Sequence, residues 1–271
     1  MKNMQFMRIN ARTDKEKEDA NERLWKLMNK ALSLPGSFNY PFDSLKTIGI
    51  EVSPDKQFRL ITWDVPKSGC TFSYYGFIQS YNAKKKKYDL FILKDHTADI
   101  VNPQAAACTP DKWLGMLYYK IIKSKGSKFY TLLAWQGCSK QITRKVIDIL
   151  SFNTQGIPSF GKAVFQKLPA TFKGNPKRIL FEYSADVSMS LRYDDSKGII
   201  MFDLLGPIED GLTGQHQYYG PSFQVDGMKF SDGFWIYAVN VEARNPNNTK
   251  EDSHQKPYND ENKKVIYHTP H

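Results

Sequence analysis

The sequence has few cysteines and no long hydrophobic run. Its 271 residues contain three cysteines, Cys70, Cys108 and Cys138, and no CxxC pair. This spacing argues against a zinc knuckle and a thioredoxin-like redox site, and an odd count does not fit a disulfide framework. No run approaches the roughly 18 apolar residues of a membrane helix. We therefore expect three incidental cysteines and no transmembrane segment.

Motifs for several common reactions are also missing. The absence of Walker and GxGxxG spacings argues against NTPases and dinucleotide enzymes, and the absence of a GxSxG elbow argues against α/β hydrolases. His96 and Asp99 lie three residues apart, but no HExxH, EF-hand loop or His/Cys cluster accompanies them. We expect no metal site and no cofactor, and the sequence assigns no catalytic residue.

The two ends of the chain differ from its middle. The first twenty residues lack the apolar stretch of a signal peptide. As given, the chain therefore predicts a cytoplasmic protein, or an exported one whose leader lies upstream. The last residues are polar and Asn-rich, which predicts a loose tail. The predicted organisation is an N-terminal helix and linker (1–36), a single β-rich domain (37–244) and a polar tail (245–271).

The clearest pattern lies between Arg178 and Leu205. Met189, Leu191 and Tyr193 alternate with polar residues, as expected of a strand with one buried face. The turn formers 194–198 follow, and the next apolar run predicts an interior strand. Similar segments recur along the chain, and aromatic residues make up 14% of it. We predict an all-β fold, an antiparallel multi-stranded meander that is propeller-like or sandwich-like.

One amphipathic helix is predicted before the β region. Thr13 and Glu16 have the spacing of a capping box, and apolar residues then recur at helical intervals up to Leu32. Leu34-Pro35-Gly36 ends the helix. We expect it to cover one face or end of the β structure, with partner binding as the alternative.

The chain is basic, with a formal net charge of +10. Such a charge raises nucleic acid as a partner. The lysines are spread along the sequence, however, and the one tight run, Lys84 to Lys87, lies between two predicted strands. A lysine-rich turn is typical of a solvated tip, so nucleic-acid binding is not expected.

Several blocks of sequence carry a resemblance. They are SPDKQFRLITWD, YYGFIQ, LYYKIIKSKGSKFYTLLAWQG, ILFEYSADVSMSLRYDD and YYGPSFQVDGMKFSDGFWIY. Together, from about Leu45 to Asn245, they resemble a group of uncharacterised β-rich proteins of Bacteroidetes-type bacteria. The resemblance implies export to the periplasm or cell surface. No activity is established for the group, so it implies no residue roles.

Candidate binding residues fall into three sets. Adjacent tyrosines point to opposite faces of a strand, so the outward rings of the Tyr-Tyr pairs could form a platform for sugars with Trp63 and Trp135; the favoured alternative is that these rings fill a large β core. The long connection 203–226 contributes His216, Tyr218 and Tyr219, with plain structural packing as the alternative. Strand-end carboxylates form the third set: Asp64, Glu182 and Asp203.

Two functions follow from these sets. The first is a non-enzymatic binding or scaffold protein of the cell envelope, with a glycan or an envelope protein as its partner. The alternative is a glycan hydrolase whose carboxylate site lies under the loop 203–226, because paired carboxylates hydrolyse glycosides. The oligomeric state stays open at this point.

Overall fold

The fold is described from a computed structural model, which describes residues 1–172 and 174–241. Residues Met1–Val241 form one compact unit that includes the N-terminal helices. The predicted tail (245–271) lies outside the described residues.

Two helices begin the chain, where the sequence pattern predicts one. The predicted helix is α2, Asp14–Leu32, and its capping box is present: Thr13 N donates to Glu16 Oε2 (3.1 Å) and Glu16 N donates to Thr13 Oγ1 (3.2 Å). The additional helix is α1, Lys2–Asn10, whose buried residues are Gln5 and Arg8. A helix that buries polar residues has no apolar periodicity, so the hydrophobic pattern misses it.

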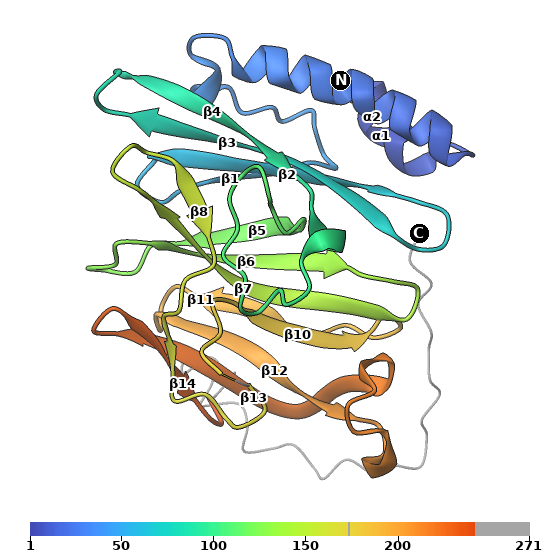
Figure 1. The fold of residues 1–271 in the computed structure, drawn as a ribbon, viewed down its shortest axis with the longest axis vertical. Helices are drawn as coiled ribbons and strands as arrows, with labels where there is room; N and C mark the ends of the chain where they lie inside the picture. Colours follow the sequence, from blue (N-terminus) through green and yellow to red (C-terminus); the bar gives the residue numbers. More distant parts are fainter. Residues whose placement is uncertain (173, 242–271) are drawn as a thin grey trace, which may run out of the picture. The chain divides into compact units, whose positions relative to one another are not determined.

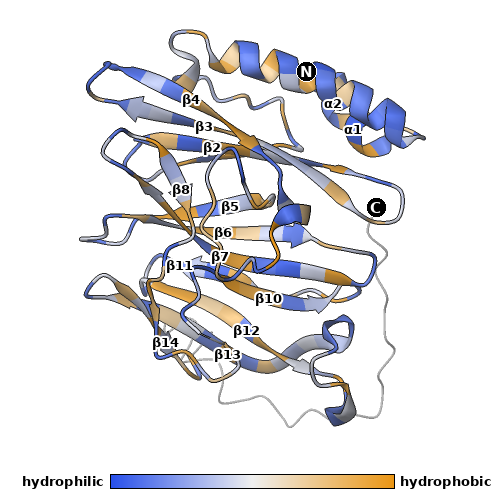
Figure 2. Ribbon diagram, in the orientation of Figure 1, coloured by the Kyte–Doolittle hydropathy of each residue, from blue (hydrophilic) through white to orange (hydrophobic). Residues whose placement is uncertain are grey.

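The first sheet is a four-stranded antiparallel meander in the order β1-β2-β3-β4. Its strands are β1 (Gly49–Val52), β2 (Phe58–Pro66), β3 (Phe72–Asn82) and β4 (Lys87–Lys94). The predicted lysine run forms the turn between β3 and β4, which is blue in Figure 2.

The second sheet has the order β10-β7-β6-β5, with β8 paired to β7. It contains β5 (Leu117–Ile122), β6 (Tyr130–Gly137), β7 (Ile142–Phe152), β8 (Pro158–Phe160) and β10 (Ile179–Ser184). The third sheet has the order β11-β12-β13-β14-β9. It contains β9 (Phe165–Gln166), β11 (Leu191–Asp194), β12 (Ile199–Pro207), β13 (Tyr219–Ser231) and β14 (Phe234–Ala238).

The elements of this unit stack as four layers: the helices, then the first, second and third sheets (Figure 1). Each interface has its own hydrophobic core. Leu24 and Met28 of α2 pack on Trp63 of β2, Leu60 packs in the core shared with the second sheet, and Trp235 packs in the core between the second and third sheets. From the orange run along β12 in Figure 2, Ile200 and Phe202 belong to that last core.

The central pattern is met in part: the turn and β12 lie where the sequence predicts them, but β11 begins at Leu191, so Met189 precedes the strand. Met189 and Leu191 are buried, β11 pairs antiparallel with β12, and Gly198 in the intervening turn has φ +64°. The all-β antiparallel prediction holds, and stacked sheets are consistent with its sandwich-like form, while the propeller-like form stays a prediction. Among the described residues, no helix has the length and apolarity needed to cross a lipid bilayer.

Glu51 of β1 makes stability depend on pH. Burial raises its pKa to about 7, and Lys120 opposes this shift. An acid whose pKa is raised by folding stabilises the fold fully below its unfolded pKa, near 4.5, and this contribution is lost as the pH rises through 7. We expect Glu51→Gln to exceed the wild type in unfolding free energy by about 1–3 kcal/mol above pH 7 and to match it near pH 4.5.

Urea unfolding at pH 5 and pH 8 measures this difference. The exposed Glu209→Gln variant is the control, with little change expected at either pH. If Glu51→Gln changed the free energy of unfolding equally at pH 5 and pH 8, the raised pKa of Glu51 would be contradicted.

Candidate functional site

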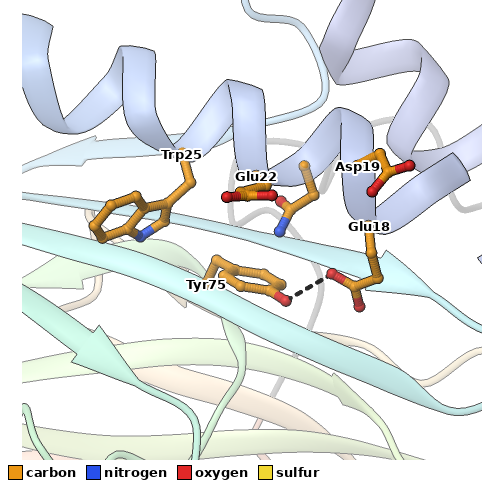
Figure 3. Close-up of a pocket in the computed structure, with 6 residues that line it drawn as sticks. Glu18, Asp19, Glu22, Trp25 and Tyr75 are labelled. Atoms are coloured by element: carbon orange, nitrogen blue, oxygen red, sulfur yellow. Dashed lines mark hydrogen bonds between the residues drawn. The ribbon is translucent and has the colours of Figure 1, made fainter. Parts of the chain in front are cut away.

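A groove lies between α2 and β3, on the helix side of the first sheet (Figure 3). It has a cavity volume of about 340 Å³. Two aromatic side chains, three carboxylates and one amide line it: Trp25, Tyr75, Glu18, Asp19, Glu22 and Asn21. We call it the acidic–aromatic groove. Aromatic rings beside carboxylates offer both a stacking surface and hydrogen-bond acceptors.

Helical spacing puts the groove residues in one row. Residues three and four apart on a helix are neighbours, so Glu18, Glu22 and Trp25 follow one side of α2. Leu24 and Met28, on the adjacent face, are fully buried against the first sheet. The buried face therefore fixes which side chains border the groove.

The aromatic floor of the groove is held from below. The Tyr75 ring stacks on Trp63, with 6.0 Å between ring centroids and 16° between planes. Trp63 is fully buried, and its Nε1 donates to Asn21 Oδ1 at 2.7 Å. Trp25 packs on Phe77 at 5.8 Å. These contacts hold both partly buried aromatic rings in place without a ligand.

The carboxylates differ in how far they are already engaged. Glu18 accepts a hydrogen bond from the Tyr75 hydroxyl (3.0 Å) and pairs with Lys67 (2.9 Å). Burial, followed by the Glu18 charge, raises the pKa of Tyr75, so the phenol stays a hydrogen-bond donor. Glu22 pairs with the exposed Lys26, which lowers the pKa of Glu22. Asp19 is exposed, and no ion pair or hydrogen bond is recorded for it among the described residues.

The predicted tryptophan platform is wrong for one of its two members. Trp63 lies in the core under α2, because the helix covers that face of the first sheet. Trp135 on β6 is partly exposed, and its ring meets Phe72 edge-on at 5.5 Å. One Tyr-Tyr pair divides between two faces: Tyr74 is buried, whereas Tyr75 reaches the groove. In the second pair Tyr118 is buried and Tyr119 packs on the core between the second and third sheets, so neither ring forms an outer platform.

The three strand-end carboxylates lie in three different sheets. Asp64 belongs to β2, where burial raises its pKa and Arg8, 3.4 Å away, opposes the shift. Glu182 belongs to β10 of the second sheet. Asp203 belongs to β12 of the third sheet and accepts a hydrogen bond from Ser190 N at 2.7 Å. Each carboxylate has its own local partner.

The long connection does reach one predicted carboxylate. Its 3₁₀ turn η4 (His216–Tyr218) lies beside β10, and His216 Nε2 is 3.6 Å from Glu182 Oε2. Arg144 Nε also donates to Glu182, at 2.6 Å. Tyr219 packs its ring on His216 at 4.8 Å, and Tyr218 is 41% exposed. In the described ranges, the ion-pair partners of Glu182 are Arg144 and His216.

The described residues include no group of three or more His, Cys, Asp or Glu side chains placed to hold a metal ion. Within the same part of the chain, Cys70, Cys108 and Cys138 are free thiols. Burial raises the pKa of Cys138 to about 11, which keeps its thiol protonated and a poor nucleophile.

Sequence reasoning named Tyr75 only as part of a doublet and did not name Trp25, Glu18 or Glu22. A local signal existed. Trp25 directly follows a core leucine of α2, and two glutamates precede it at helical spacing. The pattern could not identify the strand that faces them.

Comparison with known proteins gives no relative. No family model, curated protein or solved structure matches this chain.

Proposed function

We propose that this protein is a non-enzymatic binding protein of the cell envelope that holds a glycan in the acidic–aromatic groove. The observation that carries the proposal is the pairing of the exposed edges of Trp25 and Tyr75 with three carboxylates in one cavity. Sugar rings stack their apolar C–H faces on aromatic side chains, and carboxylates accept hydrogen bonds from sugar hydroxyls.

The groove is also suited to binding because its floor is already fixed. Tyr75 is held by Trp63 and by Glu18, so a ligand need not order it. Binding to a pre-organised site costs less conformational entropy. The resemblance to exported β-rich proteins supports the envelope as the compartment.

The hydrolase alternative has less support. A glycosidase needs two carboxyl groups about 5–10 Å apart across the scissile bond. Under the connection 203–226, Glu182 is engaged by Arg144 and His216. Asp64 and Asp203 belong to other sheets.

Removal of the Trp25 ring tests the glycan site. We expect Trp25→Ala to weaken binding of soluble envelope oligosaccharides by about tenfold, as lost stacking of about 1.4 kcal/mol would give. Isothermal titration calorimetry against a panel of such oligosaccharides measures the affinity. Phe223→Ala is the matched control, because Phe223 is a fully exposed aromatic residue of β13 outside the groove.

Equal loss in both variants, or no binding by the wild type, would rule out the groove as a glycan site. Release of reducing ends from a bound oligosaccharide would instead favour the hydrolase. Fractionation of the producing cells tests the envelope assignment.

A further inference from the structure

A second cavity, independent of the acidic–aromatic groove, lies where the chain turns after α2. It has a volume of about 440 Å³, within the range of small-molecule sites. The turn after the helix forms one wall, and β3 and β4 form the other; the lining includes Leu32–Phe38, Gln79, Lys86, Lys87, Tyr88 and Leu90. We call it the turn cavity.

The walls of the turn cavity are largely apolar. Phe38 stacks on Tyr88 with 4.1 Å between ring centroids and 11° between planes. Leu34 is 57% exposed although it lies on the wall, and Leu90 is partly buried. An exposed leucine beside a concave aromatic surface is apolar area that a ligand can remove from water.

The polar groups inside the turn cavity are already satisfied. Gln79 Nε2 donates to Leu32 O (2.9 Å) and to Ser37 Oγ (2.8 Å), and Gln79 Oε1 accepts from Arg59 Nε (2.8 Å). A ligand in this cavity would therefore make van der Waals contacts with the wall, because these polar groups of the wall already have hydrogen-bond partners. The cavity therefore favours a ligand whose buried part is apolar.

The rim carries an excess of positive charge: Lys85 and Lys87 both lie within electrostatic range of Asp89, and Lys86 adds a third cation. Lys86 and Lys87 are exposed, and no ion pair is recorded for either in the described part of the chain. The neighbouring Lys85, by contrast, pairs with Asp89 at 3.0 Å. Behind the wall, the buried Arg59 adds a further cation that hydrogen-bonds to carbonyl oxygens of the turn. An anionic group at the rim would meet complementary charge.

We propose that the turn cavity binds an acyl chain with an anionic head group. The chain lies against Leu34, Leu90 and the Phe38 ring, and the head group lies between the ammonium groups of Lys86 and Lys87. Within the described residues neither lysine forms an ion pair with another side chain, so both ammonium groups can turn toward the ligand.

Calorimetric titration with decanoate, below its micelle concentration, tests the proposal. We expect saturable binding of decanoate and none of decyltrimethylammonium, which has the same chain and the opposite charge. Lys86→Glu/Lys87→Glu should weaken decanoate binding at least tenfold. The control Lys125→Glu/Lys128→Glu makes the same charge change at the exposed β5–β6 turn and should stay within twofold.

Leu34→Gln tests the apolar wall without a change of charge and should weaken binding several-fold. Equal affinity for both amphiphiles, equal loss in the two lysine variants, or no decanoate binding would each overturn the proposal. Should the Lys86/Lys87 variant fail to fold by circular dichroism, Leu34→Gln and the two amphiphiles still decide.

Phosphatidylglycerol vesicles separate a free acyl anion from a lipid surface. Vesicle binding without decanoate binding would assign the lysines to a membrane surface and overturn the cavity. Trp25→Ala should bind decanoate like the wild type, so failure here is distinguishable from failure of the glycan site.

Discussion

Replacing Asp148 with alanine is expected to lower the free energy of unfolding by about 3–5 kcal/mol. Asp148 on β7 and Arg178 form a buried ion pair, with side chains 1% and 0% exposed and 3.1 Å between Oδ1 and Nε. Arg178 also donates to Pro103 O and to Ala106 O, which lie before β5 in the chain. Removal of the carboxylate would leave a guanidinium buried without its counter-charge.

Urea unfolding of the wild type and of Asp148→Ala measures the loss, provided that the slope of the unfolding free energy against urea concentration is the same for both proteins. The control is Asp195→Ala, which breaks an exposed pair with Lys120 and should cost less than about 1 kcal/mol. The double variant Asp148→Leu/Arg178→Met should recover only part of the stability: it removes both charges, but it leaves Pro103 O and Ala106 O without their donor. A single-variant loss below about 1 kcal/mol would contradict the interpretation.

Replacing Arg59 with methionine is expected to cost about 3 kcal/mol. Arg59 is 1% exposed and donates to Ser37 O (2.7 Å), Tyr40 O (2.9 Å) and Gln79 Oε1. Burial lowers its pKa to about 10, so the charge itself is unfavourable in the fold. The hydrogen bonds offset this, and each acceptor left buried without a donor costs about 1–3 kcal/mol.

Urea unfolding again measures the effect, with Arg192→Met on the exposed side of β11 as the control, expected within about 0.5 kcal/mol. Arg59→Lys should recover little, because an ammonium lacks the planar fork that reaches three acceptors. Full recovery by lysine would mean that charge alone, rather than the fork, holds the turn.

Features set by neighbours in the sequence could be predicted from it. The Thr13–Glu16 capping box spans four residues, and the turn that ends at Gly198 spans five, so their hydrogen bonds depend on local residues alone. The burial of Leu191 beside the exposed Arg192 follows from the alternation of a strand with one buried face.

The first helix shows where such prediction ends. α1 is held by Gln5, which donates to Ser44 O at 2.7 Å, and by Arg8, which reaches Thr47 and Asp64. Its partners lie 39 or more residues away in the chain. Hydrophobic periodicity carries no information about polar contacts of this kind.

The sequence by itself determined the antiparallel β class, the long helix α2 and its cap, and the lysine turn between β3 and β4. Only the tertiary structure decided which side chains share a surface. Trp63 is core because α2 lies over it, and Tyr75 meets Glu18 from a position 57 residues along the chain. Backbone alternation fixes the face of a strand on which a side chain stands, whereas the element that covers that face is selected by packing between distant segments.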